Sequence, residues 1–587
     1  MTKANVSLTH KCGLRLAAAT AAILFSALPG AQGNTAYDIT PDSIHRHIAV
    51  LAHDSLEGRE VGEIGEWKAA QYIMGVFRDA GLEPKGSDSG YLQPFEFTKA
   101  IDFGPANHLT VNGAQLQLGE EFSPLRQSAN GPFSFGEVVF VDYGIVVDEA
   151  DGDYDNYRGL DVAGKAVVIK RFAPARPDSS AADTNGINFD RYAYLTDKIN
   201  TAIEREASAV FLITPEDMED TLTAIGPTRI NPKEIPIIFL RRKALERLKL
   251  DLSAPEIRSV EGETELIKTR DTGYNVVGYL PGETDTTVII GAHYDHLGWG
   301  TETSRYHGKE KMIHNGADDN ASGTATMLEL ARFFSGRSAP RRYSLLFIAF
   351  SGEEAGILGS SYYARNMTID SGKVRMMVNL DMIGRLREQE GLMVFGTGSA
   401  TQFKDYFDSL EYDKFKITHK ESGFGGSDHI AFYSRGIPVL FFFTGAHADY
   451  HKPTDDIEKI DFEGTAAVGS FVAEVVTHFD NVGNPLTYQR TKGPERGRHS
   501  SQYSVTLGIT PDFIAEVKGL RVDAVSPDRP ADRAGILKGD IIIRMGDISV
   551  GDIYDYMSAL GRFRKGDSAT VIVEREADTL HLPVVFE

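Results

Sequence analysis

The sequence predicts an α/β protein built on a mostly parallel mixed sheet that is flanked by helices. Between residues 275 and 478, apolar segments such as "TTVIIGAHYDHL" and "YSLLFIAF" alternate with segments of helical periodicity such as "TATMLELARFF". Strands that are apolar almost throughout are typical of parallel sheets covered by helices on both faces. Because ligands of such sheets bind at the carboxyl ends of the strands, functional residues are expected where these segments end.

Residues 40–97 open the same domain with two predicted helices. The first begins where Thr40 is followed by Pro41, since a threonine cap and a proline in the first turn are typical of a helix start. The second, "EWKAAQYIMGVFRDAGL", has helical periodicity and ends at Gly81. We therefore expect an amphipathic helical start to the domain.

Changes in composition divide the rest of the chain. Short β-rich runs between acidic, glycine-rich loops indicate a separate β-rich insert, and the apolar content falls sharply in "NPLTYQRTKGPERGRHSSQ", which indicates a linker. The predicted parts are a signal peptide (1–33), the first part of the main domain (34–103), the insert (104–263), the catalytic part of the main domain (264–483), the linker (484–502) and a C-terminal domain (503–587).

The N-terminus has the pattern of a secretory signal peptide. Lys3, Lys11 and Arg15 flank the start of the apolar run Leu16–Leu28, and small residues follow it. A short membrane anchor is the alternative, but the run is shorter than the ~20 residues that span a bilayer. The only cysteine, Cys12, would leave with the signal, and a mature chain without thiols suits an oxidising compartment. We therefore expect a secreted or periplasmic protein with no integral membrane segment after signal removal.

The charge balance limits the possible partners. The 587 residues include 83 acidic and 61 basic side chains, which gives a formal net charge of −22. Phosphate binding needs a basic surface, so neither nucleic acid nor an anionic membrane is an expected partner.

Ionisable side chains gather at the ends of the predicted strands. Any one of them could be a helix cap or a solvated strand end, but carboxylates concentrated at one edge would repel each other unless a cation neutralised them. Imidazole and carboxylate ligands without thiolate suit Zn²⁺ first, then Mn²⁺ or Co²⁺. The residues are His293, Asp295, His296, Asp318, Asp319, Glu353, Glu354, Asp381 and His451.

Two of these residues are expected to act as a pair. His293 and Asp295 are two positions apart on a predicted strand, so their side chains face the same way. Asp295 could then accept a hydrogen bond from the ring of His293 and fix the tautomer of a metal-binding histidine.

Five motifs, in this order, resemble the M28 family of dizinc aminopeptidases: "GAHYDHLG", "NGADDNASG", "FSGEEAGILGS", "NLDMIG" and "YHKPTDD". The resemblance covers residues 40–97 and 275–478 and implies two zinc ions per chain. In the family the bond after the bridging aspartate is cis, which implies a cis bond between Asp318 and Asp319. The implied roles are bridging carboxylate for Asp318, ligands of one zinc for Glu354 and His451, ligands of the other for His293 and Asp381, and general base for Glu353.

The resemblance implies a zinc-dependent aminopeptidase that removes N-terminal residues from peptides through a metal-bridging hydroxide, with Glu353 taking the proton. Its preference for a free N-terminus comes from the family and is not visible in the residues. One alternative is a glutaminyl cyclase-like transferase on the same fold, which would work with one zinc. Another is a catalytically inactive protein that binds partners, and lost ligands would be its signature.

The sequence departs from the family in "SGFGGSDH". Many relatives have a tyrosine there whose phenol polarises the substrate carbonyl, whereas this chain has Phe424, which cannot donate a hydrogen bond. Polarisation is then expected from zinc itself or from His447 or Tyr450, each of which could also be an ordinary loop residue. We expect Phe424 to line an apolar substrate pocket.

The two other domains carry resemblances of their own. The insert resembles a protease-associated (PA) domain in "GKAVVIKR", "ASAVFLIT" and "IPIIFL", and an unrelated β-rich insert is the alternative. The C-terminal domain resembles a PDZ domain in "YSVTLGI" and in Ala534–Asp540. This implies that the amides of Leu507, Gly508 and Ile509 hold the terminal carboxylate of a peptide ligand. A degenerate PDZ domain that only packs on the catalytic domain is the alternative.

Overall fold

The computed structural model describes most of the chain after residue 36, and three folded parts are described here one by one. The predicted signal peptide and the predicted linker from residue 492 onward lie outside the described residues. Within the described part of the chain, no helix combines the length and the apolar character needed to cross a membrane. The described residues are 37–147, 154–174, 189–192, 194–220, 232–251, 253–301, 303–491, 505–511, 517–525, 529–576 and 578–587.

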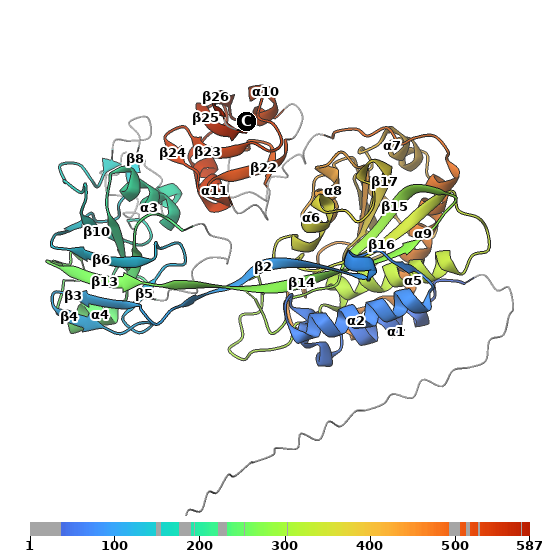
Figure 1. Cartoon of the computed structure of the whole chain (residues 1–587), viewed down its shortest axis with the longest axis horizontal. Coiled ribbons are helices and arrows are strands. Elements are labelled where there is room, and N and C mark those ends of the chain that lie inside the picture. Colours follow the sequence, from blue (N-terminus) through green and yellow to red (C-terminus); the bar gives the residue numbers. More distant parts are fainter. Residues whose placement is uncertain are drawn as a thin grey trace, which may run out of the picture. The chain divides into compact units, whose positions relative to one another are not determined.

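The α/β domain is built on a nine-stranded sheet in the order β1-β14-β16-β15-β17-β20-β18-β19, with β2 paired to β14 (Figure 1). Strands β16, β15, β17 and β20 are mutually parallel, while β14 and β18 are antiparallel to their neighbours β16 and β20. The sheet is therefore mixed with a parallel centre, and the predicted fold class is confirmed. The bounds are β1 Glu83–Pro84, β2 Leu92–Phe103, β14 Leu266–Leu280, β15 Thr284–His293, β16 Tyr343–Phe350, β17 Val374–Leu380, β18 Leu392–Phe395, β19 Ile417–Lys420 and β20 Val439–Phe443.

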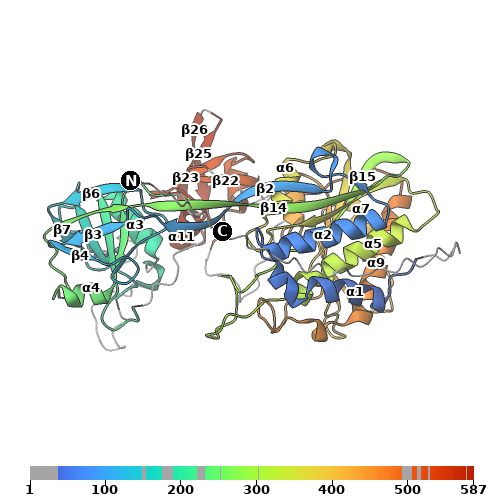
Figure 2. The same ribbon diagram turned by 60° about the horizontal axis from the view of Figure 1, so that its bottom comes forward.

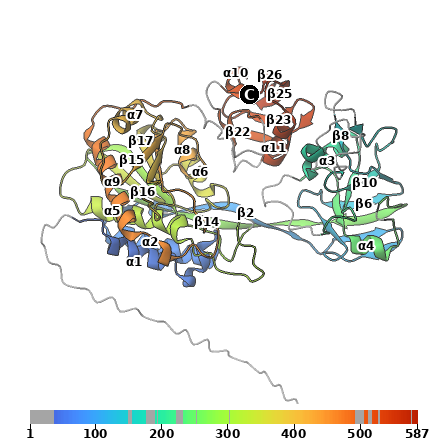
Figure 3. The ribbon, with the colours of Figure 1, turned by 180° about the vertical axis from the view of Figure 1, so that it is seen from behind.

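Helices cover both faces of this sheet. Helices α1, α2, α5 and α9 lie side by side on one face (Figure 2), and α6 and α8 lie on the other (Figures 1 and 3). Side chains of β16 alternate between the two cores: Leu345 and Phe347 pack with the first group of helices, and Leu346 and Ile348 pack with the second. The bounds are α1 Pro41–Leu51, α2 Ile64–Asp79, α5 Gly323–Ser335, α6 Leu358–Arg365, α7 Thr401–Asp408, α8 His429–Tyr433 and α9 Phe462–Asn481.

The first two helices begin and end for the reasons that the sequence gives. The hydroxyl of Thr40 caps α1 by accepting a hydrogen bond from the amide of Ser43. In return, the Thr40 amide donates to the Ser43 hydroxyl at 3.1 Å, and Pro41 occupies the first turn. Gly81, with φ +76°, adopts the left-handed conformation just beyond α2. Both predicted helices are confirmed.

The insert is reached through a long antiparallel pair of strands. Leu92 of β2 pairs with Val276 of β14, and the pairing continues to Phe103 opposite Leu266. Beyond it, β7, β10, β11 and β12 form a parallel set that β5 extends, and β4, β3, β13 and β6 form a second sheet. The bounds are β3 His108–Val111, β4 Ala114–Leu116, β5 Phe122–Pro124, β6 Gly131–Phe135, β7 Val138–Phe140, β8 Val146–Val147, β9 Tyr154–Asp155, β10 Ala166–Lys170, α3 Leu195–Glu204, β11 Ala209–Ile213, β12 Ile237–Leu240, α4 Arg242–Arg247 and β13 Val260–Thr264.

The C-terminal domain has its own sheet in the order β21-β22-β23-β25-β26, with β24 paired to β23, and its own core. In the predicted carboxylate loop, the side chain of Leu507 is buried in that core, and Gly508 has φ +79°, which favours glycine. The bounds are β21 Ile509–Pro511, β22 Leu520–Val525, α10 Pro530–Ala534, β23 Ile541–Met545, β24 Ile548–Ser549, α11 Ile553–Arg562, β25 Ser568–Arg575 and β26 Asp578–Val585.

Candidate metal centre

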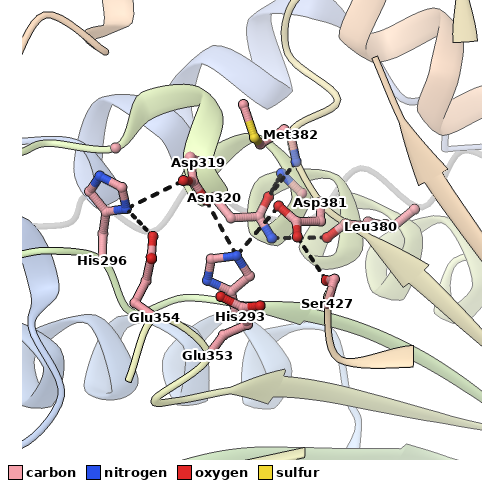
Figure 4. A network of polar contacts seen from close by, with 12 residues as sticks. His293, His296, Asp319, Asn320, Glu353, Glu354, Leu380, Asp381, Met382 and Ser427 are labelled. Carbon is pink, nitrogen blue, oxygen red and sulfur yellow. Dashed lines mark hydrogen bonds and ion pairs between the residues drawn. The ribbon is translucent and has the colours of Figure 1, made fainter. Parts of the chain in front are cut away.

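Four neighbouring parallel strands deliver the candidate residues to one edge of the sheet. His293 is the last residue of β15, Glu353 lies three residues beyond β16, Asp381 directly follows β17, and the turn that carries His451 follows β20. The carboxyl ends of parallel strands meet at one edge, so these side chains converge from distant parts of the sequence (Figure 4).

The carboxylate of Asp319 lies at the centre of the cluster. Its Oδ1 is 3.4 Å from Nε2 of His293, and its Oδ2 is 3.3 Å from Nε2 of His451. Asp319 belongs to both groups of side chains that could hold a metal ion: His293, Asp319 and Asp381, and His296, Asp319 and Glu354. Its two oxygens thus face two different sets of neighbours, which is the arrangement of a bridging carboxylate.

This geometry corrects the prediction that Asp318 is the bridging residue. Asp318 is turned away from the cluster, and its Oδ1 accepts hydrogen bonds from the amide of Gly384 at 2.6 Å and the hydroxyl of Ser322 at 3.0 Å. The predicted cis bond is also one residue out of register, because the cis bond joins Asp319 and Asn320. Two adjacent aspartates look alike in a sequence, and the backbone path decides which one faces the metal ligands.

The side chain of Asn320 ties the segment with Asp319 to the end of β17. Its Nδ2 donates to the carbonyl of Leu380 at 2.9 Å, and its Oδ1 accepts from the amides of Gly323 at 2.9 Å and Met382 at 3.2 Å (Figure 4). Since Asp381 lies between Leu380 and Met382, these bonds fix the ligand segments from both sides.

The first group is completed by His293 and Asp381. Nε2 of His293 is 3.4 Å from Oδ1 of Asp381, and Oδ2 of Asp381 accepts a hydrogen bond from the hydroxyl of Ser427 at 2.7 Å. Nδ1 of His293 lies 3.2 Å from the backbone carbonyl of Asp295, so a proton on Nδ1 leaves Nε2 free to face the carboxylates. Ser427 was not predicted, since a lone serine beyond the strand ends gives no sequence signal.

Two histidines contact Glu354: His296, which belongs to the second group, and His451 beside it. Nε2 of His451 is 3.1 Å from Glu354 Oε2, and Nδ1 of His296 is 2.8 Å from Glu354 Oε1. Nδ1 of His451 lies 3.0 Å from the carbonyl of Thr303, which favours the tautomer that leaves Nε2 toward the cluster. The sequence resemblance assigned no role to His296, although its position at a strand end was a signal.

The adjacent glutamates are held by Asp295. The backbone amides of Glu353 and Glu354 donate to the two oxygens of the Asp295 carboxylate at 3.1 and 3.3 Å. This differs from the expected pairing of Asp295 with the His293 ring: the Asp295 carboxylate is 3.6 Å from Nδ1, because its oxygens are turned to the two amides. Asp295 therefore orients the glutamate segment, and its carbonyl rather than its carboxylate contacts His293.

The buried site shifts the pKa values of two of its carboxyl groups in opposite directions. Burial, reinforced by the nearby Glu354 and Asp381 carboxylates, raises the pKa of Glu353 well above its ordinary value. Burial acts in the same sense on Asp319, but the rings of His293 and His451, 3.4 and 3.3 Å away, outweigh it and hold the pKa of Asp319 well below its ordinary value. One carboxyl group is thus suited to hold a proton, while the other is suited to stay ionised among cations.

The donor set fits zinc. Oδ2 of Asp319 and Oδ1 of Asp381 are buried and accept no hydrogen bond from the described residues. Buried carboxylate oxygens without partners are costly, and a cation at each group would satisfy the oxygen that faces it. Imidazole nitrogens and carboxylate oxygens in groups of three, without cysteine, are ligands that suit Zn²⁺.

A buried arginine that the sequence analysis did not single out joins the surrounding loops. The guanidinium of Arg59 donates to the carbonyls of Tyr294 and Asn315, both at 2.7 Å, to that of Gly316 at 3.1 Å, and to that of Leu51. Burial lowers the pKa of Arg59 to about 10, and the carboxylates of the cluster act against this shift. Arg59 therefore places a buried positive charge close to the carboxylates of the cluster.

The three predicted substrate-binding residues have different surroundings. Tyr450 packs on His451 with ring centroids 3.8 Å apart, and Nε2 of the partly buried His447 is 3.1 Å from Asp318 Oδ2. Phe424 packs edge-on against Tyr433 with centroids 4.9 Å apart. The predicted pocket role for Phe424 gains no support from this position.

A cleft of about 330 Å³ lies beside the second group of ligands. His296 and Glu354 border it, and Val61, Phe97 and Leu358 supply an apolar wall. Phe424 is absent from the described residues that line it. The cleft offers space for a side chain next to the candidate metal ligands.

Two regions of the chain are similar in sequence to known protein families. Residues 275–476 match the model of peptidase family M28, and residues 505–585 match that of the PDZ domain. A probable leucine aminopeptidase of Trichophyton verrucosum is 30% identical over 220 residues, which cover 34% of this chain and 56% of that protein. Aminopeptidase YwaD of Bacillus subtilis is 30% identical over 224 residues, which cover 35% of this chain and 45% of that protein.

Solved structures of aminopeptidases also align with much of the chain. The aminopeptidase from Aneurinibacillus sp. strain AM-1 aligns with a TM-score of 0.47 at 22% identity over 79% of this chain and 99% of that chain. BSAP, a zinc aminopeptidase from Bacillus subtilis, aligns with a TM-score of 0.47 at 22% identity over 76% of this chain and 97% of that chain.

The chain thus contains a region similar to peptidase family M28, followed by a region similar to the PDZ domain. It spans about half the length of the curated relatives that it matches. The insert between the two parts of the α/β domain is matched by neither of these two family models.

Proposed function

We propose that this protein is a secreted or periplasmic dizinc aminopeptidase that hydrolyses the N-terminal residue of peptides. The observation that carries the proposal is the carboxylate of Asp319, whose two oxygens face two groups of histidine and carboxylate ligands. His293 and Asp381 would hold one ion, and Glu354 and His451 the other. His296, which belongs to the second group, would add a hydrogen bond or a further ligand there.

Glu353 is the proposed general base. It lies between the end of β16 and the start of α6, where Asp295 holds its amide. Burial raises the pKa of its carboxyl group, which makes it a stronger base that can take a proton from an attacking water molecule and give it to the leaving amine. Zinc, when bound, supplies Lewis-acid chemistry that lowers the pKa of water and stabilises negative charge on a carbonyl oxygen.

Tyr450 is the better of the two proposed donors to the substrate carbonyl. Burial raises the pKa of its phenol far above the ordinary value, and the carboxylates of Asp319, Glu354 and Glu353 raise it further. A phenol that remains protonated beside these groups can donate a hydrogen bond to a developing oxyanion. His447 instead lies against Asp318, on the other side of the ligand segment.

The two alternatives predict different metal contents. A glutaminyl cyclase-like transferase would need one zinc ion, and an inactive binding protein would lack ligands. Both candidate groups of ligands are complete in this chain, which favours two ions and hydrolysis. Peptides are the proposed substrates, and a peptide C-terminus is the proposed ligand of the PDZ domain.

The test is hydrolysis of a panel of aminoacyl anilides and peptides, with N-terminally blocked peptides as controls. The proposal predicts release of the first residue from free peptides and none from blocked ones. A chelator should abolish the activity, and Zn²⁺ or Co²⁺ should restore it. Cleavage of blocked peptides, or activity that survives removal of metal, would overturn the proposal.

A further inference from the structure

We propose that Asp455, held in place by Arg385, is a positioning residue for the shared carboxylate of Asp319. The inference rests on the proposed function, because it concerns how the chain aims the residue that would bridge the two metal ions. Asp455 lies in the motif "YHKPTDD", in which the sequence analysis assigns roles to Tyr450 and His451 but none to Asp455.

The carboxylate of Asp455 binds the backbone of the bridging segment directly. Its Oδ2 accepts the amide hydrogens of Asp318 and Asp319, each at 3.0 Å, and its own carbonyl accepts the amide of Ala317 at 3.1 Å. The side chain of Asp455 is completely buried. Because the amide of Asp319 and its side chain share the same Cα atom, fixing that amide limits where the carboxylate of Asp319 can point.

Arg385 connects this contact to the other ligand segments. Its Nη2 donates to Oδ1 of Asp455 at 2.7 Å. Arg385 follows Asp381 by four residues, and Asp455 follows His451 by four residues. This ion pair therefore joins the segment after β17 to the turn that carries His451, and Asp455 joins both to Asp319.

The same device occurs on the other side of the site. Asp295 accepts the consecutive amides of Glu353 and Glu354, just as Asp455 accepts those of Asp318 and Asp319. In each case a buried aspartate holds two successive peptide groups beside a proposed metal ligand. Groups that orient ligands in this way tune metal affinity although they do not touch the metal.

Arg385 also provides a matched control. Its Nη1 donates to Oδ2 of Asp449 at 2.8 Å, so one arginine pairs with two aspartates. The Asp449 carboxylate also accepts hydrogen bonds from Thr454 and Lys459, at 2.7 and 2.5 Å, and among the described residues it makes none with the amides of the bridging segment. A substitution at Asp449 therefore disturbs Arg385 without disturbing Asp319 directly.

The experiment compares full-length wild type with Asp455→Asn and Asp449→Asn. An asparagine has one acceptor oxygen and one NH₂ group, so at position 455 it must turn a donor either toward Arg385 or toward the two amides. Zinc affinity is measured by competition with a chelator, ligand geometry by the visible absorption of the Co²⁺-substituted proteins, and catalysis by kcat and KM on a peptide substrate.

Asp455→Asn is expected to weaken zinc binding by at least about tenfold, to change the Co²⁺ spectrum, and to lower kcat with KM little changed, as for other residues that orient metal ligands. Asp449→Asn is expected to stay within about threefold of wild type in each measurement. Unchanged zinc affinity and an unchanged spectrum in Asp455→Asn would overturn the proposal. Equal losses in both variants would overturn it too, since they would reflect a general effect of the Arg385 network.

Arg385→Met covers the case in which Asp455→Asn does not fold. This variant keeps the contact of Asp455 with the amides but removes its ion pair, so zinc affinity should fall by more than in Asp449→Asn. An affinity equal to that of Asp449→Asn would overturn the role of the pair. Failure of the proposed function is distinguishable, because wild type would then fail to bind two metal ions or to hydrolyse free peptides.

Discussion

The amide of Glu353 donates to the carboxylate of Asp295 at 3.1 Å, which ties the proposed general base to the end of the neighbouring strand β15. Glu354 makes the corresponding bond at 3.3 Å, and its side chain turns to His296 and His451. A strand that leads through a short turn into a helix can thus aim two adjacent carboxylates at different tasks. One is available for the proton and the other for the metal.

The roles of the two glutamates should separate on mutation. Glu353→Gln keeps the shape but removes the base, so kcat should fall by the ~10²–10⁴-fold typical of general-base catalysis while zinc stays bound. Glu354→Gln should lower zinc occupancy, with activity partly recovered by excess metal. Bound zinc and kcat of both variants check this. If Glu353→Gln loses metal and Glu354→Gln does not, the two roles are reversed.

Replacing Tyr450 by phenylalanine should affect the chemical step. The variant keeps the packing on His451 but loses the phenol, so kcat should fall roughly 10- to 100-fold with KM within about threefold of wild type. Steady-state kinetics on a dipeptide measures this, and His447→Asn is the comparison. Wild-type kcat in Tyr450→Phe together with a large loss in His447→Asn would assign carbonyl polarisation to His447 instead.

The fold class and the edge of the sheet that carries the site could be predicted because both depend on strong, repeated signals. Apolar strands alternate with helices, and ionisable residues follow β15, β16, β17 and β20. The choice between Asp318 and Asp319 could not be predicted in this way. It depends on the backbone path through Asn320 and on its bonds to Leu380 and Met382, which involve residues some 60 positions away.

Supporting residues gave weaker signals for the same reason. Arg59 binds only backbone carbonyls, and Asp455 binds backbone amides, so no pattern of side-chain types reveals their partners. The start of the predicted linker is a similar case. Its low apolar content predicts a linker, but two of its residues bind the α/β domain. The amide of Gln489 donates a hydrogen bond to the carbonyl of Ser399, and the amide of Thr491 donates one to the hydroxyl of Tyr433.

These contacts refine a prediction about the C-terminal domain. All proposed ligands and Glu353 precede residue 484, so a chain that ends after Thr491 should keep most of its turnover on a dipeptide. A chain that ends at Asn484 would lack the contacts of Gln489 and Thr491 and should be less stable to heat. A fragment ending after Thr491 that folds and binds zinc but is inactive would show that the PDZ domain contributes to the active site.

His429 should make the α/β domain sensitive to acid. Its ring is completely buried and stacks on Phe441 with centroids 4.5 Å apart, and burial lowers its pKa to about 3. Between this value and the ~6.5 of an unfolded histidine, the unfolded state binds a proton that the folded state does not. Above about pH 6.5, His429 therefore does not lower the free energy of unfolding. As the pH falls below that value, the free energy of unfolding decreases, by about 2 kcal/mol at pH 5.

Thermal unfolding of His429→Leu and wild type at pH 7 and pH 5 tests this effect. Between pH 7 and pH 5, the midpoint temperature of unfolding should fall less in His429→Leu than in wild type. The control His45→Leu, at an exposed position on α1, should show the same fall as wild type. An equal acid shift in His429→Leu and wild type would contradict the assignment.

The central claim is that Asp319 joins two zinc sites, and counting zinc in purified protein tests it most directly. Elemental analysis should give two zinc ions per chain in wild type and in Asp318→Asn, because Asp318 faces Gly384 and Ser322 rather than the ligands. Asp319→Asn should lose most of the bound metal, since both groups of ligands include its carboxylate. One ion per wild-type chain with no second site on titration, or loss of metal in Asp318→Asn but not in Asp319→Asn, would contradict the account.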